Sequence, residues 1–218
     1  VGGIFMSLIV SAPEGGSKWP LLESGTYPAV CIGIIDIGEH ENNMYDNTAR
    51  KVIIMWELPG ETMENDGEIE SRVMSETYTA SLSEKANLRK MLDGWRGRPF
   101  TQEELRGFDL RNILGIPCLL GTVVKENNGG RQFAKIGTVS KLPKGFPAPM
   151  ARNPQIIFDL DDPNHDMEAL PKWIQDRIKE SITYQSRIDR MEDVQDDINP
   201  FAGVNADDVC ATAFGNGY

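Results

Sequence analysis

The sequence predicts a mainly β protein with a few helices. Five segments are rich in β-branched residues or alternate polar and apolar positions, and one segment between them has apolar residues at helical spacing. The predicted order is strand, strand, strand, helix, strand, strand. With 218 residues, the chain can bury a full core without the support of a disulfide or a metal.

The first three strands are expected over 25–37, 50–58 and 73–82. Gly33 in the first of these marks a bulge or a bend. The last two strands are expected over 117–125 and 131–142. Asn127-Asn-Gly-Gly130 joins them, with the residue types that a hairpin connection needs for positive φ.

The helix is predicted by apolar residues one turn apart, namely Leu88, Met91, Leu92 and Trp95. Ser81-Leu-Ser-Glu84 has the spacing of a capping box in front of it. Thr101-Gln-Glu-Glu104 has the same spacing and predicts a second, short helical segment.

This order of strands and helix is typical of a five-stranded OB-fold barrel, in which the helix lies between strands three and four. Beyond residue 144, proline and glycine become frequent, Pro171 opens another helix, and the last residues are acidic and aperiodic. We therefore expect a leader over 1–21, an OB-fold domain over 22–145, a linker with a C-terminal helix over 146–190, and a disordered acidic tail over 191–218.

Charge is distributed unevenly along the chain, whose formal net charge is −11. Residues 71–150 hold 13 basic and 7 acidic side chains, whereas residues 151–218 hold 6 basic and 14 acidic ones. A basic block in an acidic protein is either a solvated face or a surface for a polyanion.

Signals for catalysis are weak. The two histidines, His40 and His165, accompany no nucleophile motif, and there is no glycine-rich phosphate loop. The carboxylates of 159–166 fail as an EF-hand because Pro163 takes a ligand position. We expect no enzyme activity, no metal and no cofactor. No apolar run is long enough for a membrane span, and three widely separated cysteines favour a reduced, cytosolic setting.

Aromatic residues are interleaved with the basic block, as a sequence-tolerant groove for single-stranded nucleic acid requires. For Trp56 a core position is the favoured interpretation, whereas stacking and packing remain equally open for Tyr78 and Phe133. Arg96 and Arg98, in a glycine-rich loop, are interpreted as phosphate contacts. The candidate nucleic-acid-binding residues are Arg50, Lys51, Trp56, Tyr78, Lys85, Arg89, Arg96, Arg98, Phe100, Lys125, Arg131, Phe133 and Lys135.

Several segments also resemble those of a known family. They are Gly25-Thr-Tyr-Pro-Ala, Gly33-Ile-Ile-Asp-Ile-Gly38, Trp56-Glu-Leu-Pro-Gly60, the run from Tyr78 to Lys90, Trp95-Arg-Gly-Arg-Pro-Phe100, and the run from Leu170 to Ser181. Together they resemble OB-fold single-stranded DNA-binding proteins of tailed bacteriophages over about residues 20–181. The resemblance implies a protein in the cytoplasm of a bacterial host that coats single-stranded DNA during replication or recombination.

The tail contains Asp196-Asp-Ile-Asn-Pro-Phe201. It is similar to the acidic tip with which bacterial single-stranded DNA-binding proteins recruit partner enzymes, although Asn199 is inserted and 17 residues follow Phe201. Asp196, Asp197, Pro200 and Phe201 are therefore candidate contacts for replication or recombination proteins. A coincidental acidic linker is the alternative.

Two other function classes stay open at this point. An adaptor that uses the OB-fold for protein contacts would explain the negative net charge without DNA. A metal-dependent nuclease using the Asp159–Asp166 cluster is the weaker alternative.

Overall fold

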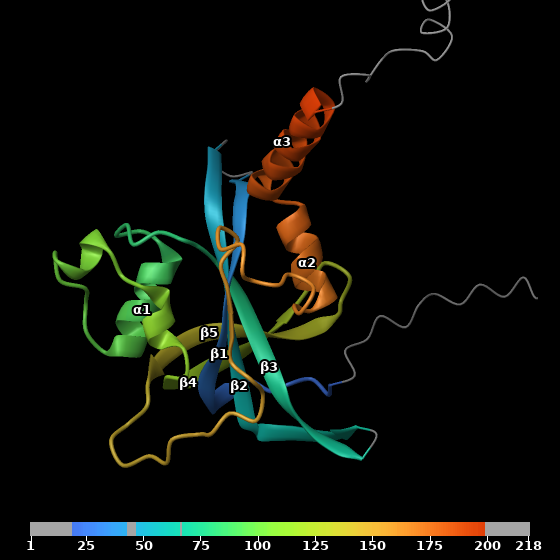
Figure 1. Cartoon of the computed structure of the whole chain (residues 1–218). Coiled ribbons are helices and arrows are strands. Elements are labelled where there is room, and N and C mark those ends of the chain that lie inside the picture. The colour runs from blue at the N-terminus through green and yellow to red at the C-terminus, as the bar shows by residue number, and fades with distance from the viewer. Residues whose placement is uncertain (1–18, 43–46, 66, 199–218) are drawn as a thin grey trace, which may run out of the picture.

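The structure, a computed structural model, describes residues 19–42, 47–65 and 67–198 (Figure 1). Its strands are β1 (Gly25–Asn42), β2 (Asn47–Asn65), β3 (Glu68–Thr79), β4 (Pro117–Glu126), β5 (Gln132–Lys141) and β6 (Ile156–Phe158). Its helices are α1 (Asn87–Arg96), α2 (Lys172–Lys179) and α3 (Ile182–Ile198), with short 3-10 turns η1 (Glu104–Arg106) and η2 (Leu110–Ile113). The predicted mainly β architecture, with a helix between the third and fourth strands, is confirmed.

The five long strands form one curled antiparallel sheet in the order β3-β2-β1-β4-β5, and β6 adds to β1 in parallel. β3 and β5 are the two ends of this order and are not hydrogen-bonded to each other. In the described part of the chain the sheet is therefore not closed into a barrel, and the finer prediction of a five-stranded OB-fold barrel stays a prediction.

β1 carries two bulges in its pairing with β2. Its pairing with β2 shifts between Cys31 and Gly33, and again between Asp36 and Gly38. The bulge predicted at Gly33 is confirmed. Gly38 adopts a φ of 79°, which a residue with a Cβ rarely takes.

Apolar side chains alternate between two cores, one on each face of β1 and β2. α1, η2 and the curled β4 and β5 cover one face, and α2 with the adjoining loops covers the other, where β6 contributes Phe158 (Figure 1). The α1-side core includes Ile34, Ile54, Trp56, Leu88, Leu92, Trp95 and Leu120. The α2-side core includes Ile35, Ile37, Ile53, Phe158, Ile174 and Ile178.

Residues 146–190, predicted as a linker with one helix, are an integral layer of the fold. The Glu57 side chain on β2, fully buried, accepts hydrogen bonds from the backbone N–H groups of Arg152 (2.9 Å) and Asn153 (3.0 Å). A buried carboxylate needs such partners because its desolvation is costly. The segment after β5 is thereby held on the sheet.

The C-terminal boundary also differs from the prediction. We expected irregular chain from residue 191, whereas α3 continues to Ile198. The rest of the predicted tail, residues 199–218, and most of the predicted leader, residues 1–18, lie outside the described residues.

Two capping boxes were predicted from the sequence around α1, and the structure contains one of them. The helix begins at Asn87 without a side-chain cap, so the capping box predicted at Ser81 is wrong. The second box is confirmed: the Thr101 N–H donates to Glu104 Oε2 (2.9 Å), and the Glu104 N–H donates to Thr101 Oγ1 (3.3 Å).

Two of the three cysteines, Cys31 and Cys118, are buried free thiols in the α1-side core. Burial raises the pKa of Cys31 to about 12, which keeps the thiol protonated. Among the described residues, no helix has the length and apolar character to cross a membrane.

Gly38→Ala should destabilise the fold far more than Gly67→Ala. Both glycines have positive φ, so each alanine carries a backbone penalty of about 1–2 kcal/mol. A Cβ at Gly38 would also lie 2.8 Å from Ser181 Oγ and 2.9 Å from Leu160, whereas one at Gly67 meets nothing within 4 Å. Overpacking adds about 1–3 kcal/mol. Urea unfolding of both variants measures the difference, and equal losses would contradict the described docking of the C-terminal layer.

Candidate nucleic-acid interface

The open edge between β3 and β5 is the most distinctive surface of the molecule, and we call it the β3/β5 seam. The curl of the sheet brings the two strands into contact without pairing them. Lys135 Nζ on β5 lies 3.6 Å from Glu76 Oε1 on β3, which forms an ion pair across the seam. Side chains, rather than backbone hydrogen bonds, therefore line this edge.

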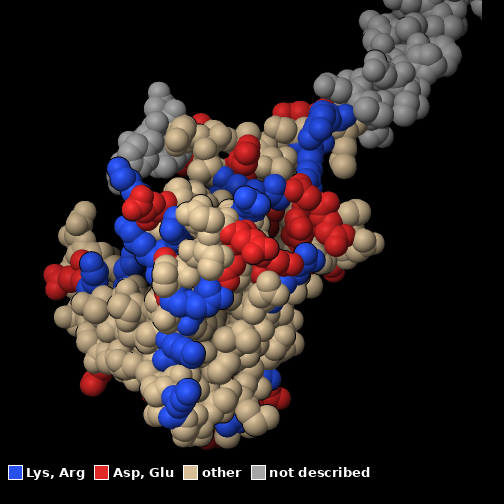
Figure 2. All heavy atoms as spheres, turned by 90° about the vertical axis from the view of Figure 1, so that its left-hand side faces the viewer, with Lys and Arg blue, Asp and Glu red and all other residues tan. Residues whose placement is uncertain are grey.

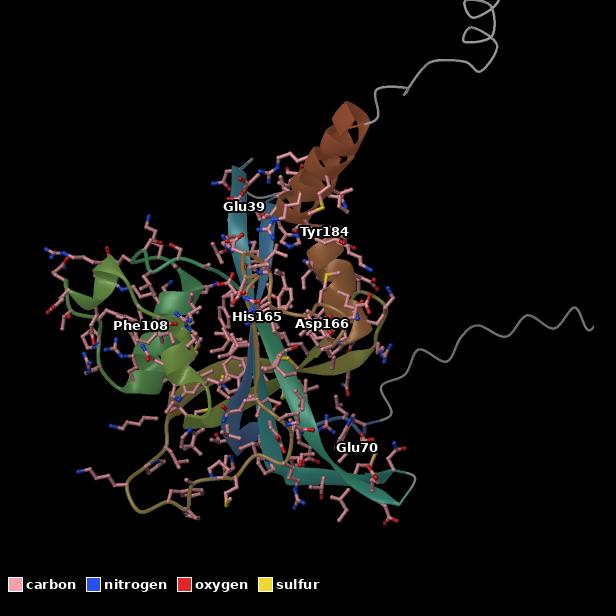
Figure 3. The ribbon with its side chains drawn as sticks, viewed as in Figure 1. Glu39, Glu70, Phe108, His165, Asp166 and Tyr184 are labelled. Atoms are coloured by element: carbon pink, nitrogen blue, oxygen red, sulfur yellow. The ribbon has the colours of Figure 1, made fainter. Side chains whose placement is uncertain are left out.

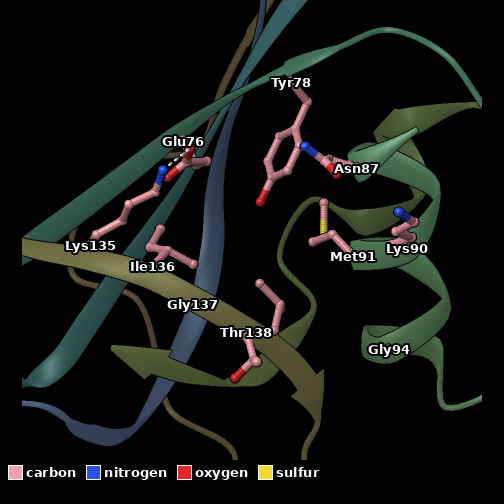
Figure 4. Close-up of a pocket in the computed structure, with 11 residues that line it drawn as sticks. Glu76, Tyr78, Asn87, Lys90, Met91, Gly94, Lys135, Ile136, Gly137 and Thr138 are labelled. Carbon is pink, nitrogen blue, oxygen red and sulfur yellow. Dashed lines mark ion pairs between the residues drawn. The ribbon is translucent and has the colours of Figure 1, made fainter. Parts of the chain in front are cut away.

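A cleft of about 380 Å³ opens where α1 lies beside the seam. We call it the α1/β5 cleft, and Figure 4 shows it in close-up. α1 approaches β5 closely because Gly94 has no side chain: a Cβ there would lie 2.9 Å from the Val139 carbonyl oxygen. The cleft is lined by Glu76, Tyr78, Asn87, Lys90, Met91, Gly94 and residues 135–139.

Tyr78 provides the aromatic surface of the α1/β5 cleft. Its ring points into the cleft from β3 and faces Met91 across it (Figure 4). Burial raises the pKa of Tyr78, and the Glu76 carboxylate raises it further, so the phenol stays protonated and can donate a hydrogen bond. The ring is largely buried, with one side forming the wall of the hollow.

Lysines form the rim of the cleft. Lys90 on α1 is exposed, and the Lys135 side chain is 46% exposed despite its contact with Glu76. Lys141 lies over the C-terminal end of α1, where a Cβ at Gly97 would meet its side chain at 3.5 Å. Figure 2 shows Lys and Arg side chains gathered in a band down the face that carries α1, whereas acidic side chains gather nearer α3.

Phe133 lies near the start of β5, and Arg131 directly precedes that strand. They line a second hollow, with residues of β3 and of the segment before β1. Phe133 is 42% exposed, so its ring is open to a ligand. Of the predicted aromatic candidates, Phe133 is exposed beside a hollow, whereas Tyr78 lines the α1/β5 cleft but is only 8% exposed and also packs in the α1-side core.

Trp56 and Phe100 are core residues. Trp56 is 0% exposed and packs with Trp95 at a ring-centroid distance of 6.0 Å, and Phe100 packs edge-on against Phe108. Neither ring can stack on a base in this fold, so their selection as nucleic-acid contacts is wrong. The core interpretation of Trp56 is confirmed.

Arg96 and Arg98 have the structural partner that the sequence analysis did not recognise. Both guanidinium groups pair with Glu104, and that of Arg96 also lies over the Phe100 ring, 4.1 Å from its centroid. The Arg96 side chain is only 14% exposed, whereas that of Arg98 is 56% exposed. The interpretation of Arg96 as a free phosphate contact is wrong. Arg98 keeps an accessible face.

Three further candidates lie close to α1. Lys85 is exposed and precedes the helix, which begins at Asn87. Arg89 donates to the Leu82 carbonyl oxygen (3.3 Å) and has Asp93 nearby, so it supports the loop before α1. Lys125, at the end of β4, is exposed.

Arg50 and Lys51 lie away from the seam. Lys51 Nζ donates to Thr79 Oγ1 at 2.9 Å. The Arg50 guanidinium pairs with Asp36 and Asp161 and lies 3.9 Å from Asp159. Its pKa is raised by these hydrogen bonds, the bond to Asp36 being the strongest influence. Arg50 is therefore a structural residue that joins β2 to the loop after β6.

Among the described residues, these three carboxylates are the group whose spacing best suits a metal ion. Oxygen atoms of Asp36, Asp159 and Asp161 lie within 4.8 Å of one another. The cation that they share is the Arg50 guanidinium, and Arg187 also pairs with Asp161. Ion pairing with arginines accounts for this cluster, which gives no support to a nuclease.

The tail candidates lie at the limit of the described chain. Asp196 and Asp197 fall in the last turns of α3, and their side chains are not described. Pro200 and Phe201 lie outside the described residues.

Figure 3 shows the side chains over the whole fold, including Phe108 near α1 and His165 in the loop after β6. Sequence reasoning missed Trp19, which it assigned to the leader, and Arg72. The available signal is their position, since the aromatic Trp19 precedes the first predicted strand and the cation Arg72 precedes the third. The sequence does not link them, because only a long-range contact makes them neighbours.

Comparisons of this chain with protein-family models, with curated proteins and with solved structures found no match.

Arg96→Ala should destabilise the protein by about 1–3 kcal/mol, since it removes a largely buried cation from Glu104 and from the Phe100 ring. Arg98→Ala should cost clearly less, because its pair with Glu104 is exposed. Urea denaturation of the two single variants separates the roles. Equal losses would contradict the structural assignment of Arg96.

The stabilising effect of Glu104 should depend on pH. Arg96 and Arg98 hold the pKa of Glu104 well below its ordinary value of 4.5. Its contribution to stability is therefore fully present above that value and is lost as the pH falls below it. The free energy of unfolding of wild type should exceed that of Glu104→Gln at about pH 7, and the difference should shrink towards about pH 2. A pH-independent difference would show that ionisation of Glu104 plays no part.

Proposed function

We propose that this chain binds single-stranded DNA along the β3/β5 seam, with little dependence on base sequence. The α1/β5 cleft carries the proposal, because it places an aromatic ring, Tyr78, below a rim of lysines, Lys90 and Lys135. An aromatic surface for a base and cations for the phosphates are the two requirements of a sequence-tolerant single-strand site.

The fold supports the same proposal. We assign the chain to the OB-folds on the order of its strands and the position of α1, and an OB-fold is a partly open Greek-key barrel. OB-folds bind oligonucleotides on the face of their second and third strands and with the loops after strands one and four, and of these elements β3 lines the α1/β5 cleft. The resemblance of the sequence to single-stranded DNA-binding proteins of tailed bacteriophages points to the same ligand.

Electrostatics favour a polyanion at this face. The chain as a whole has a net charge of −11, so a random face would repel DNA. The exposed cations at the cleft instead create a local attraction that is screened by salt. A single strand is favoured over a duplex because only an unstacked base can offer its flat face to a ring in a cleft.

Two rival functions predict different outcomes. A protein adaptor would bind no DNA at all. A nuclease would need a metal, and the described carboxylates grouped closely enough for one are Asp36, Asp159 and Asp161, where the Arg50 guanidinium already pairs with Asp36 and Asp161. We propose no catalytic role and no cofactor. Recruitment of replication or recombination proteins through Asp196, Asp197, Pro200 and Phe201 stays a prediction from the sequence.

Fluorescence anisotropy with labelled single-stranded and duplex oligonucleotides, at two salt concentrations, tests the proposal. We expect preference for the single strand and an affinity that falls as salt rises. No binding of either oligonucleotide at low salt would overturn the proposal, and loss of substrate on adding a divalent metal would favour a nuclease.

Lys90→Ala combined with Lys135→Ala should weaken single-strand binding and flatten its salt dependence. Loss of two phosphate contacts should reduce the magnitude of the log–log salt slope by about 1.4, at about 0.7 per contact. The affinity should fall further, because Glu76 then faces the DNA without its partner lysine.

Lys172→Ala combined with Lys179→Ala is the matched control. It removes the same charge from α2, which packs on the other face of the sheet. Its salt slope should equal that of wild type. Identical slopes for the two double variants would place the DNA elsewhere on the molecule.

A further inference from the structure

A second hollow lies along the seam beyond the α1/β5 cleft, and we call it the Trp19 groove. Its volume is about 570 Å³, and β3, the β4–β5 connection and the segment before β1 build it. The lining residues are Trp19, Pro20, Leu21, Leu22, Arg72, Val73, Met74, Ser75, Asn127, Arg131, Gln132, Phe133 and Ala134.

The segment that carries Trp19 is fixed by contacts with the sheet. The Leu22 side chain is buried in the α1-side core, and Thr122 Oγ1 on β4 donates to the Glu23 carbonyl oxygen at 2.8 Å. Arg72 on β3 donates to the Pro20 carbonyl oxygen, and its guanidinium lies 4.9 Å from the centre of the Trp19 ring. Trp19 is thus held at the wall of the groove.

The groove has the chemistry of a site for a base and its phosphate. It combines the partly exposed ring of Phe133 with the indole of Trp19 and with two arginines, Arg72 and Arg131. None of its described lining residues is acidic, although the chain carries 33 acidic residues. Base–aromatic stacking beside cations needs this composition.

The groove is also continuous with the proposed DNA site. Residues 131–134 line the groove and residues 135–139 line the α1/β5 cleft, so the two hollows succeed each other along one strand. β3 gives the same succession, with Arg72–Ser75 in the groove and Glu76 and Tyr78 in the cleft. A polynucleotide that follows β5 out of the cleft therefore enters the groove.

We propose that the Trp19 groove is a second base-stacking subsite, in which Trp19 and Phe133 hold a nucleobase of the strand that also occupies the α1/β5 cleft. The inference rests on the proposed function and extends it. It assigns a binding role to a residue outside the domain predicted from the sequence.

Tryptophan fluorescence reports this subsite directly. Of the four tryptophans, Trp56 and Trp95 are buried, and Trp173 lies 47% exposed on α2. In the Trp173→Phe variant, an oligonucleotide of about 16 nucleotides should quench the tryptophan emission. The expected cause is stacking of a base on the Trp19 indole. In the Trp19→Phe variant, the same oligonucleotide should leave the emission almost unchanged. Quenching that persists in Trp19→Phe would overturn the inference.

The affinity for the same oligonucleotide provides a second test of this subsite. Trp19→Ala should weaken binding of the same oligonucleotide by about 5- to 150-fold, the effect of losing one stacked base. Trp173→Ala is the matched control and should bind as wild type does. The melting temperature of Trp19→Ala should stay near that of wild type, because Leu22 and Thr122 hold the segment independently of the indole.

The two proposals fail in different ways. If wild type binds no single-stranded DNA, the proposed function fails. If wild type binds and the Lys90/Lys135 variant shows its flattened salt slope, but Trp19→Ala equals Trp173→Ala, only the Trp19 subsite is overturned.

Discussion

The constraint on which the structure depends is that β1 is paired at both edges and covered on both faces. β2 runs along one edge, and β4 followed by β6 occupies the other. Its side chains enter the α1-side core and the α2-side core in turn, and two bulges interrupt its pairing with β2. A polar group in such a strand requires a partner of its own, which Asp36 finds in Arg50.

The position of β1 at the centre places β3 and β5 at the two ends of the sheet. Within the described part of the chain, both strands have an edge without a strand partner, and the curl brings these edges together at the β3/β5 seam. An exposed edge of this kind is a hazard for aggregation unless charges or other elements cover it. α1 covers part of the seam, and the Glu76–Lys135 pair crosses it. What remains open are the two hollows for which we propose a ligand.

Arginines and lysines have different roles in this molecule. Arg50 and Arg96 are held by carboxylates, because a planar guanidinium can bind a carboxylate at more than one point and keep it in place. Lys90 and Lys135 stand at the rim of the α1/β5 cleft on flexible stems. A lysine ammonium acts as a point charge, which suits contacts with a phosphate backbone of any base sequence.

The sequence alone determined the elements whose signals are local. Three such signals depend only on neighbours within a few residues: the alternation of polar and apolar residues in the strands, the apolar spacing from Leu88 to Trp95, and the hairpin at Asn127. The basic block is also visible in the local sequence. Only the tertiary structure decided which side chains remain accessible. Arg50 donates a hydrogen bond to Asp161, which lies 111 positions further along the chain, and the Arg72 guanidinium lies over the Trp19 ring. The gap between β3 and β5 depends on the curl of the whole sheet. These contacts have no local signature, because partners far apart in the chain become neighbours only when the sheet is formed.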